Sequence, residues 1–321
     1  MFNYTKLMRR PPVFQRTTGL SPEAFQSLTA RFASGWQAAE VQRLNRPDRR
    51  HALGGGHPYH LKNAQDMVGM FLVLCRTALT WEFAGLLFGF DGSNVRKLFF
   101  KMVPVMQAAA DPELSDYLVR ASQERQAHPG SIHDWAGFLK KCPDLAEVAV
   151  DSTEQPRQRP GKKRVRKRYY SGKSKRFTIK TGIVVSKSGR VLHVSGGYPG
   201  PINDKRLYET EKLPALIPRE TRQFLDLGYK GLDADHPGHD LRLPYKRHSP
   251  GCQGRGQTGP PLTRGQKQAN GLRRRRRVVV EHALARIKTF KIASAPWRGR
   301  VERHNPVFRA VAALTNFRLA A

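Results

Sequence analysis

The sequence predicts an α/β protein in which a helical amino-terminal part precedes a part where strands and helices alternate. Residues 61–106 repeat apolar side chains at three- and four-residue spacing, which is typical of amphipathic helices. From residue 147 the pattern changes to short apolar runs such as "EVAVDST" and "FTIKTGIVVS", which predict buried strands. A 39% apolar share of 321 residues is enough for a sizeable core.

The charge of the chain indicates a polyanionic partner. Lys and Arg number 57 against 25 Asp and Glu, a formal charge of +32. A protein with this excess repels itself unless a polyanion shares its surface, so we expect nucleic acid, ahead of an anionic membrane. The longest apolar run, "MVGMFLVLC", is too short to span a bilayer, and the first residues lack the apolar core of a signal peptide. We therefore expect a cytoplasmic protein with no membrane partner.

The three cysteines, Cys75, Cys142 and Cys252, stand alone, without the spacing of a zinc site. This usage indicates a reducing compartment and argues against a disulfide scaffold.

We divide the chain into a mixed segment (1–60), a helical domain (61–106), a helical connector (107–146) and an α/β domain (147–321). In the helical domain, a short helix over "TWEFAGLLFG" leads through a tight turn to a helix that begins "SNVRK" and is capped by Asp91 or Ser93. This order is typical of a helix-turn-helix, whose second helix enters the major groove. A plain three-helix packing element gives the same pattern, and the charge excess favours DNA binding. Four residues at the start of that helix have the right chemistry to contact bases: Ser93, Asn94, Arg96 and Lys97.

A basic run opens the α/β domain. From Arg157 to Arg190 there are fourteen Lys or Arg and no Asp or Glu, interleaved with aromatic residues. Such a run is often only a solvated face, but this one predicts a track for phosphate backbone, with Lys173, Lys175 and Arg176 among its contacts.

Two aspartates end apolar strands: Asp151 in "VAVDST" and Asp226 in "QFLDLGY". A carboxylate at the end of a buried strand is costly unless it is paired or bound to a cation. Carboxylate oxygens suit Mg²⁺ or Mn²⁺, and two such ions about 4 Å apart can drive a phosphodiester displacement. For either acid alone, a cap or salt bridge is the plainer interpretation.

The helix expected near residues 272–288 carries one carboxylate within "RRRRRVVVEHALARIK". On a helix, Arg277, Glu281 and Lys288 fall within about 40° of one another. Val278, Val279 and Ala285 offer an apolar side to bury. One face thus offers a metal-binding acid between cations that can hold DNA phosphates.

These pieces occur in an order that resembles the DDE transposases of bacterial insertion sequences, in the group allied to Harbinger-type transposases. The matching pieces lie within residues 145–320 and include "VAVDST", "PGPINDKRLYE", "FLDLGYKGL", "RRRRRVVVEHALARIKTFKI" and "LTNFRL". The resemblance implies a ribonuclease-H-like mixed sheet preceded by a helix-turn-helix domain. It also implies a catalytic triad that binds two Mg²⁺ or Mn²⁺ ions: Asp151, Asp226 and Glu281.

The resemblance also bears on residues around the triad. Arg277 and Lys288 match an R…E…K signature, and Arg274 replaces the tyrosine that often precedes this arginine; we expect all three to contact DNA. Asp204 stands in the family's "PG…D" position and could be a helix N-cap, a supporting acid or a metal ligand. We expect a cap or a supporting acid, because Asp226 has the better strand-end setting. Thr153 and His282 adjoin triad members, and ordinary packing is the plainer interpretation of both.

The function implied is that of a transposase that binds its element's terminal inverted repeats as a homodimer on paired ends, and then cuts these ends and joins them to target DNA. Its expected place is the bacterial cytoplasm, at the nucleoid. A catalytically silent DNA-binding protein is disfavoured because all three acids are present. A hydrolytic endonuclease without strand transfer needs the same acids and stays open.

Overall fold

A computed structural model describes residues 7–45, 59–126, 132–246 and 261–320. The chain forms two compact units. The first, called here the helical unit, comprises Met1–Leu114, Gln155–Arg159 and Ala285–Ala321; the second, the sheet unit, comprises Ser115–Glu154 and Pro160–Leu284. Cys252 lies outside the described residues. No helix within the described ranges is both long enough and apolar enough to cross a membrane.

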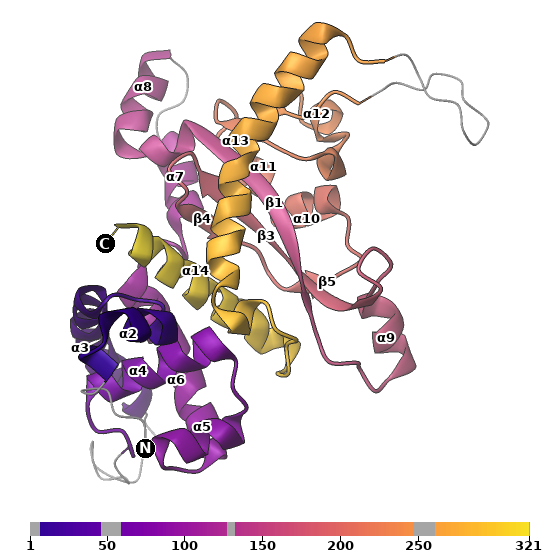
Figure 1. The fold of residues 1–321 in the computed structure, drawn as a ribbon. Helices are drawn as coiled ribbons and strands as arrows, with labels where there is room; N and C mark the ends of the chain where they lie inside the picture. The colour runs from indigo at the N-terminus through magenta and orange to yellow at the C-terminus, as the bar shows by residue number, and fades with distance from the viewer. Residues whose placement is uncertain (1–6, 46–58, 127–131, 247–260, 321) are drawn as a thin grey trace. The chain divides into compact units, whose positions relative to one another are not determined.

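The helical unit is built mainly from α-helices (Figure 1). Its α-helices are α2 (Pro11–Thr18), α3 (Pro22–Leu44), α4 (Ala64–Thr77), α5 (Trp81–Phe88), α6 (Gly92–Ala110) and α14 (His304–Ala320). The segment 1–60, expected to be mixed, therefore contains two helices among its described residues. α14 packs along α6, and Asn316 Nδ2 donates a buried 2.7 Å hydrogen bond to Asp111 Oδ2. The carboxy-terminal helix is thus part of this core.

The α5–turn–α6 segment follows the local signals in the sequence. Thr80 and Asp91 cap the two helices, each by accepting a backbone N–H. Between the helices, Gly89 has a φ of 83°, a conformation that glycine adopts without strain. A Cβ on Gly92 would lie 2.7 Å from the carbonyl oxygen of Trp81, so the two helices cross too closely for any side chain there. The predicted cap at Asp91 is confirmed.

The sheet unit contains a mixed sheet, which confirms the α/β class. Its strands are β1 (Glu147–Pro156), β2 (Tyr170–Ser171), β3 (Arg176–Ser186), β4 (Val191–Val194), β5 (Tyr198–Pro199), β6 (Arg222–Phe224) and β7 (Leu241–Arg242). The order is β2-β3-β1-β6-β7, with β4 and β5 paired to β3. β6 runs parallel to β1 and to β7, whereas β4 is antiparallel to β3. The strand expected over 222–231 is shorter, because the chain turns into a single-turn helix at Leu227–Tyr229 (η2).

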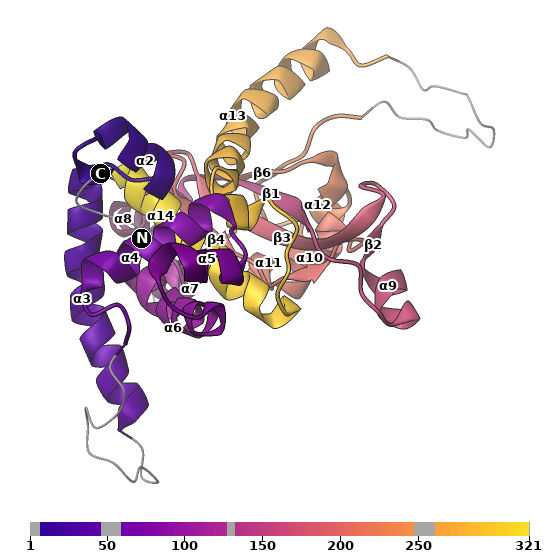
Figure 2. The same ribbon diagram turned by 60° about the horizontal axis from the view of Figure 1, so that its bottom comes forward.

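Helices surround this sheet: α7 (Tyr117–Gln126), α8 (Ile132–Lys141), α9 (Lys163–Tyr169), α10 (Asp204–Thr210), α11 (Leu213–Leu216), α12 (Leu232–Asp235) and α13 (Arg264–Lys288). The core joins Val148 and Val150 of β1 to Leu225 and to Tyr208 of α10. α9 lies beside β3 within the basic run, as both views show (Figures 1 and 2). The helix with Glu281 begins at Arg264, eight residues earlier than expected.

Candidate active site

Asp151 and Asp226, both expected at strand ends, lie level with each other along two neighbouring strands. The prediction for Asp151 is wrong, because β1 continues to Pro156, whereas Asp226 lies two residues after the last residue of β6. β1 and β6 are parallel neighbours, and Ala149 pairs with Phe224. Asp151 follows Ala149 by two residues, and Asp226 follows Phe224 by two residues. The register therefore brings both carboxylates to the same end of the β1–β6 pair. Parallel pairing keeps the residues of the two strands level, and this places acids from distant parts of the sequence in one site.

Arg277 of α13 binds both carboxylates. Its Nη2 atom lies 3.6 Å from Oδ2 of Asp151 and 3.6 Å from Oδ2 of Asp226. The two oxygens are therefore no farther apart than twice this distance. The Arg277 side chain is only 15% exposed, so here the guanidinium faces the acids rather than solvent. Its expected contact with DNA phosphate stays a prediction.

Asp204 joins this site from α10. Ser152 Oγ donates a 2.5 Å hydrogen bond to Asp204 Oδ1, and Lys180 Nζ lies 3.1 Å from the same oxygen. A Cβ on Gly228 would lie 2.6 Å from Asp204 Oδ2, so this carboxylate also contacts the loop that follows Asp226. The helix cap is Asn203, whose side chain accepts from Lys205 N. The prediction that Asp204 is an N-cap is therefore wrong, because Asp204 is the first residue inside the helix.

The concentration of acids changes the electrostatics of the site. Burial raises the pKa of Asp151, and the charges of Asp226 and Asp204 raise it further. The Ser152 N–H and Arg277 act in the opposite direction without reversing the shift. The raised pKa shows that Asp151 lacks nearby positive charge, and carboxylate oxygens are the ligands that a hard divalent cation prefers.

Three further residues belong to this cluster and were missed by sequence reasoning: Ser152, Lys180 and Tyr229. The Tyr229 hydroxyl is buried and has no hydrogen-bond partner in the described part of the chain. Burial and then the charges of the three aspartates raise the pKa of Tyr229. Ser152 and Tyr229 are close in sequence to Asp151 and Asp226, a proximity that could have signalled them. Nothing local points to Lys180, which lies mid-strand.

Glu281 lies on α13 one turn beyond Arg277, and its side chain is exposed. The described residues contain no group of three or more His, Cys, Asp or Glu side chains placed to hold a metal ion, so Glu281 is not gathered with the two aspartates. The buried residues of this part of α13 are Val280, Ala283, Leu284 and Ile287. Ala285, which was expected to be buried, is exposed.

Apart from Arg277, the residues expected to bind DNA are exposed in both units. In the helical unit, they are Ser93, Asn94, Arg96 and Lys97 of α6 and Lys288. In the sheet unit, they are Arg274 of α13 and the cations around the β2–β3 turn, Lys173, Lys175 and Arg176. Of the residues that adjoin the expected triad, Thr153 is buried and His282 is exposed.

Known proteins resemble this chain along most of its length. A family model described as DDE superfamily endonuclease matches residues 150–316. The chain is also 26% identical over 310 residues to the "Probable transposase for insertion sequence element IS702" of Microchaete diplosiphon, a match that covers 96% of this chain and 94% of that protein. No solved structure matches the chain. The matched family range contains the whole acidic site around Asp151 and Asp226, and the chain therefore belongs to the DDE superfamily endonucleases, as a transposase of the insertion-sequence kind.

Proposed function

We propose that this transposase binds the terminal inverted repeats of its element, cleaves DNA strands there and joins them to target DNA. The observation that carries the proposal is the register of β1 and β6, which sets Asp151 level with Asp226 beside one arginine. Paired carboxylates at a strand edge are the protein groups that phosphodiester chemistry with divalent metals requires.

We further propose that the sheet is ribonuclease-H-like. The strand order supports this: antiparallel β3 and β4 precede parallel β6 and β7 on the other side of β1. The first aspartate then lies on β1, the strand between β3 and β6. A rigid strand is a better support for a charged ligand than a loop.

Asp151, Asp226 and Glu281 would hold Mg²⁺ or Mn²⁺, in two positions. Because Glu281 is not gathered with the aspartates among the described residues, α13 would have to bring it to them when metal and DNA bind. When bound, these ions polarise the scissile phosphate and favour the deprotonated form of the attacking hydroxyl group. Asp204 would act as a supporting acid, because its Oδ1 is already engaged by Ser152 and Lys180. Asp226 is 49% exposed, compared with 22% for Asp151, so the site is open to DNA on the Asp226 side.

DNA recognition would use two surfaces. Exposed residues at the start of α6 would read the inverted repeats in the major groove, as a helix-turn-helix does. The exposed cations of the basic run would hold the phosphate backbone without reading sequence. A homodimer would pair the two ends of the element.

The test is a cleavage and joining assay on DNA that carries the element's ends, with Mg²⁺ or Mn²⁺ and with EDTA. The wild type is compared with Glu281→Gln and with Glu302→Gln, an exposed glutamate that serves as the matched control. We expect metal-dependent nicking and joining by the wild type and the control, and neither by Glu281→Gln.

Other outcomes would contradict specific parts of the proposal. Nicking without joining would indicate a hydrolytic endonuclease, and tight binding without nicking by any variant would indicate a silent DNA-binding protein. Cleavage that survives Glu281→Gln would remove Glu281 from the metal site and leave the aspartates to hold it.

A further inference from the structure

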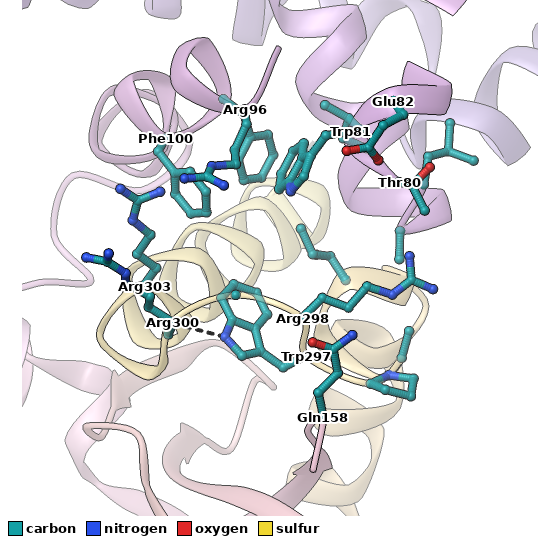
Figure 3. A pocket seen from close by; sticks show the side chains of 18 residues that line it. Thr80, Trp81, Glu82, Arg96, Phe100, Gln158, Trp297, Arg298, Arg300 and Arg303 are labelled. Atoms are coloured by element: carbon teal, nitrogen blue, oxygen red, sulfur yellow. Dashed lines mark hydrogen bonds between the residues drawn. The ribbon is translucent and has the colours of Figure 1, made fainter. Parts of the chain in front are cut away.

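The helical unit contains a pocket of about 460 Å³, a size typical of sites for small ligands. It lies between the beginning of α5, the second turn of α6 and the segment 292–303 (Figure 3). It belongs to a different unit from the acidic site, and the proposed chemistry does not use it.

Aromatic rings form two opposite walls of this pocket. Trp81 and Phe100 stand on one side and Trp297 on the other (Figure 3). The ring centroids of Trp81 and Phe100 are 5.9 Å apart, and both rings are only partly buried. The partly exposed rings of Trp81 and Phe100 offer flat apolar surfaces to a planar guest, and the buried Trp297 closes the opposite wall.

The Trp297 wall is held rigidly. Its N–H donates to Pro156 O at 2.8 Å, and its carbonyl accepts from Gln158 N at 3.1 Å. The indole Nε1 donates to Arg300 O at 3.0 Å. A Cβ on Gly299 would lie 3.0 Å from the indole ring, so a glycine lets the backbone pass close to it. Such a preformed wall reduces the entropy lost when a ligand is ordered.

Arginines surround the rings. Arg96, Arg298 and Arg300 line the pocket with exposed side chains, and none of them is ion-paired among the described residues. The guanidinium of Arg303 lies 4.3 Å from the centre of the Phe100 ring. Glu82 is the one acidic residue in the lining. The pocket therefore combines stacking surfaces with an excess of phosphate-binding groups.

We infer that this pocket binds one unpaired nucleotide of a DNA strand, with the base between the aromatic walls and its phosphates on the arginines. The inference rests on the proposed function, since it assumes that DNA is the partner. Arg96 supports it, because this pocket residue is also on the helix expected to read the duplex. A strand that leaves the duplex beside α6 would reach the rings over a short path.

The experiment measures the affinity of the full chain for a short oligothymidylate and for the same backbone with every base removed. Both probes carry equal charge, so their difference reports stacking. We expect the wild type to prefer the oligothymidylate by about tenfold or more. Trp81→Leu should lose most of this preference, while Trp81→Phe, which keeps a ring, should retain much of it. Tyr245→Leu is the matched control, because this exposed aromatic residue lies outside both the pocket and the basic run.

A second pair of variants tests the arginines. Arg300→Ala should weaken binding of both probes and make the salt dependence shallower, whereas Arg9→Ala, an exposed arginine outside the pocket, should do neither. Equal losses in both arginine variants would contradict a phosphate role for the pocket.

Duplex binding by the same proteins separates the possible failures. If duplex DNA binds but Trp81→Leu keeps the full base preference, or Tyr245→Leu loses it, the pocket inference is overturned and the proposed function stands. If no DNA binds at all, both fail. Thermal unfolding of Trp81→Phe and Trp81→Leu shows whether each variant is folded.

Discussion

At the scale of single residues, the position of Asp151 raises its pKa and does not stabilise the folded protein at neutral pH. Its pKa is raised by burial and by two neighbouring carboxylates, so the folded protein disfavours its ionised form. Stability from this group is therefore present below the pKa of the unfolded chain and falls as pH rises through the folded pKa. At neutral pH the ionised form of Asp151 is less favourable in the folded protein than its protonated form would be. Such a cost is typical of carboxylates that have a function.

This arrangement predicts opposite effects of Asp151→Asn on activity and stability. Cleavage should be abolished, because an amide is a poor ligand for a hard cation. The midpoint of thermal unfolding without added metal should stay level or rise, because the buried repulsion with Asp226 and Asp204 is removed. Asp233→Asn, at an exposed acid of the same unit, should cleave like the wild type. A midpoint several degrees lower for Asp151→Asn would show instead that this carboxylate stabilises the fold.

Gly228 controls the distance between two parts of the site. A Cβ there would meet Asp204 Oδ2 at 2.6 Å, so Gly228→Ala must move either the carboxylate or the loop after Asp226. We expect strand cleavage to fall on the order of 10²-fold, because small displacements of catalytic groups are costly. Gly238→Ala is the control, since a Cβ at Gly238 meets nothing within 4 Å. Equal activity of the two variants would exclude a strict spacing at Asp204.

At the scale of elements, Glu211 ties the end of α10 to the strands. Its carboxylate accepts hydrogen bonds from Gly196 N at 2.8 Å and Tyr198 Oη at 2.6 Å, and lies 3.1 Å from His193 Nε2. Burial alone would raise the pKa of Glu211, but these partners outweigh it and lower the pKa to about 2. α10 also carries Asp204, so this connection helps to fix the position of the acidic site.

The pKa of Glu211 predicts a pH dependence of stability. Since the pKa is lowered on folding, the contribution is full above about 4.5 and is lost as pH falls towards about 2. Glu211→Gln should lower the free energy of unfolding by roughly 3 kcal/mol at neutral pH, and the difference from the wild type should close in acid. The free energy of unfolding of both proteins, measured from neutral pH down to about pH 2, tests this prediction. Glu209→Gln, on the exposed side of the same helix, should show no such change; a constant difference at all pH values would contradict an electrostatic origin.

At the scale of the whole molecule, the charge of +32 predicts binding that depends strongly on salt. Lys173→Gln, at the exposed β2–β3 turn, should weaken binding to any DNA duplex and reduce the slope of log affinity against log salt by about 1. Lys62→Gln removes the same charge from an exposed residue of the helical unit that is not expected to bind DNA, and should leave the slope unchanged. Loss of sequence preference in Lys173→Gln would show a base contact and contradict a backbone role.

Much of the fold was predictable because its signals are local. The strands around Asp151 and in the β3–β4 hairpin, the cap at Asp91 and the helix after Asn203 follow from neighbouring residues. The predictions were wrong where packing between distant residues determines which side chains are buried. Ala285 is exposed because α13 turns the face with Val280 and Ala283 towards the interior, and this choice depends on its neighbours in space.

The sequence by itself determined the composition of the site: two aspartates that each follow an apolar run, a helix with Arg277 and Glu281, and a surplus of cations. Only the tertiary structure decided which of them meet. The register of β1 and β6 sets Asp151 level with Asp226, α10 brings in Asp204, and α13 points Arg277 inward while Glu281 stays exposed. Strand register and helix rotation arise from contacts between residues far apart in the chain, and for this reason no local pattern could reveal them.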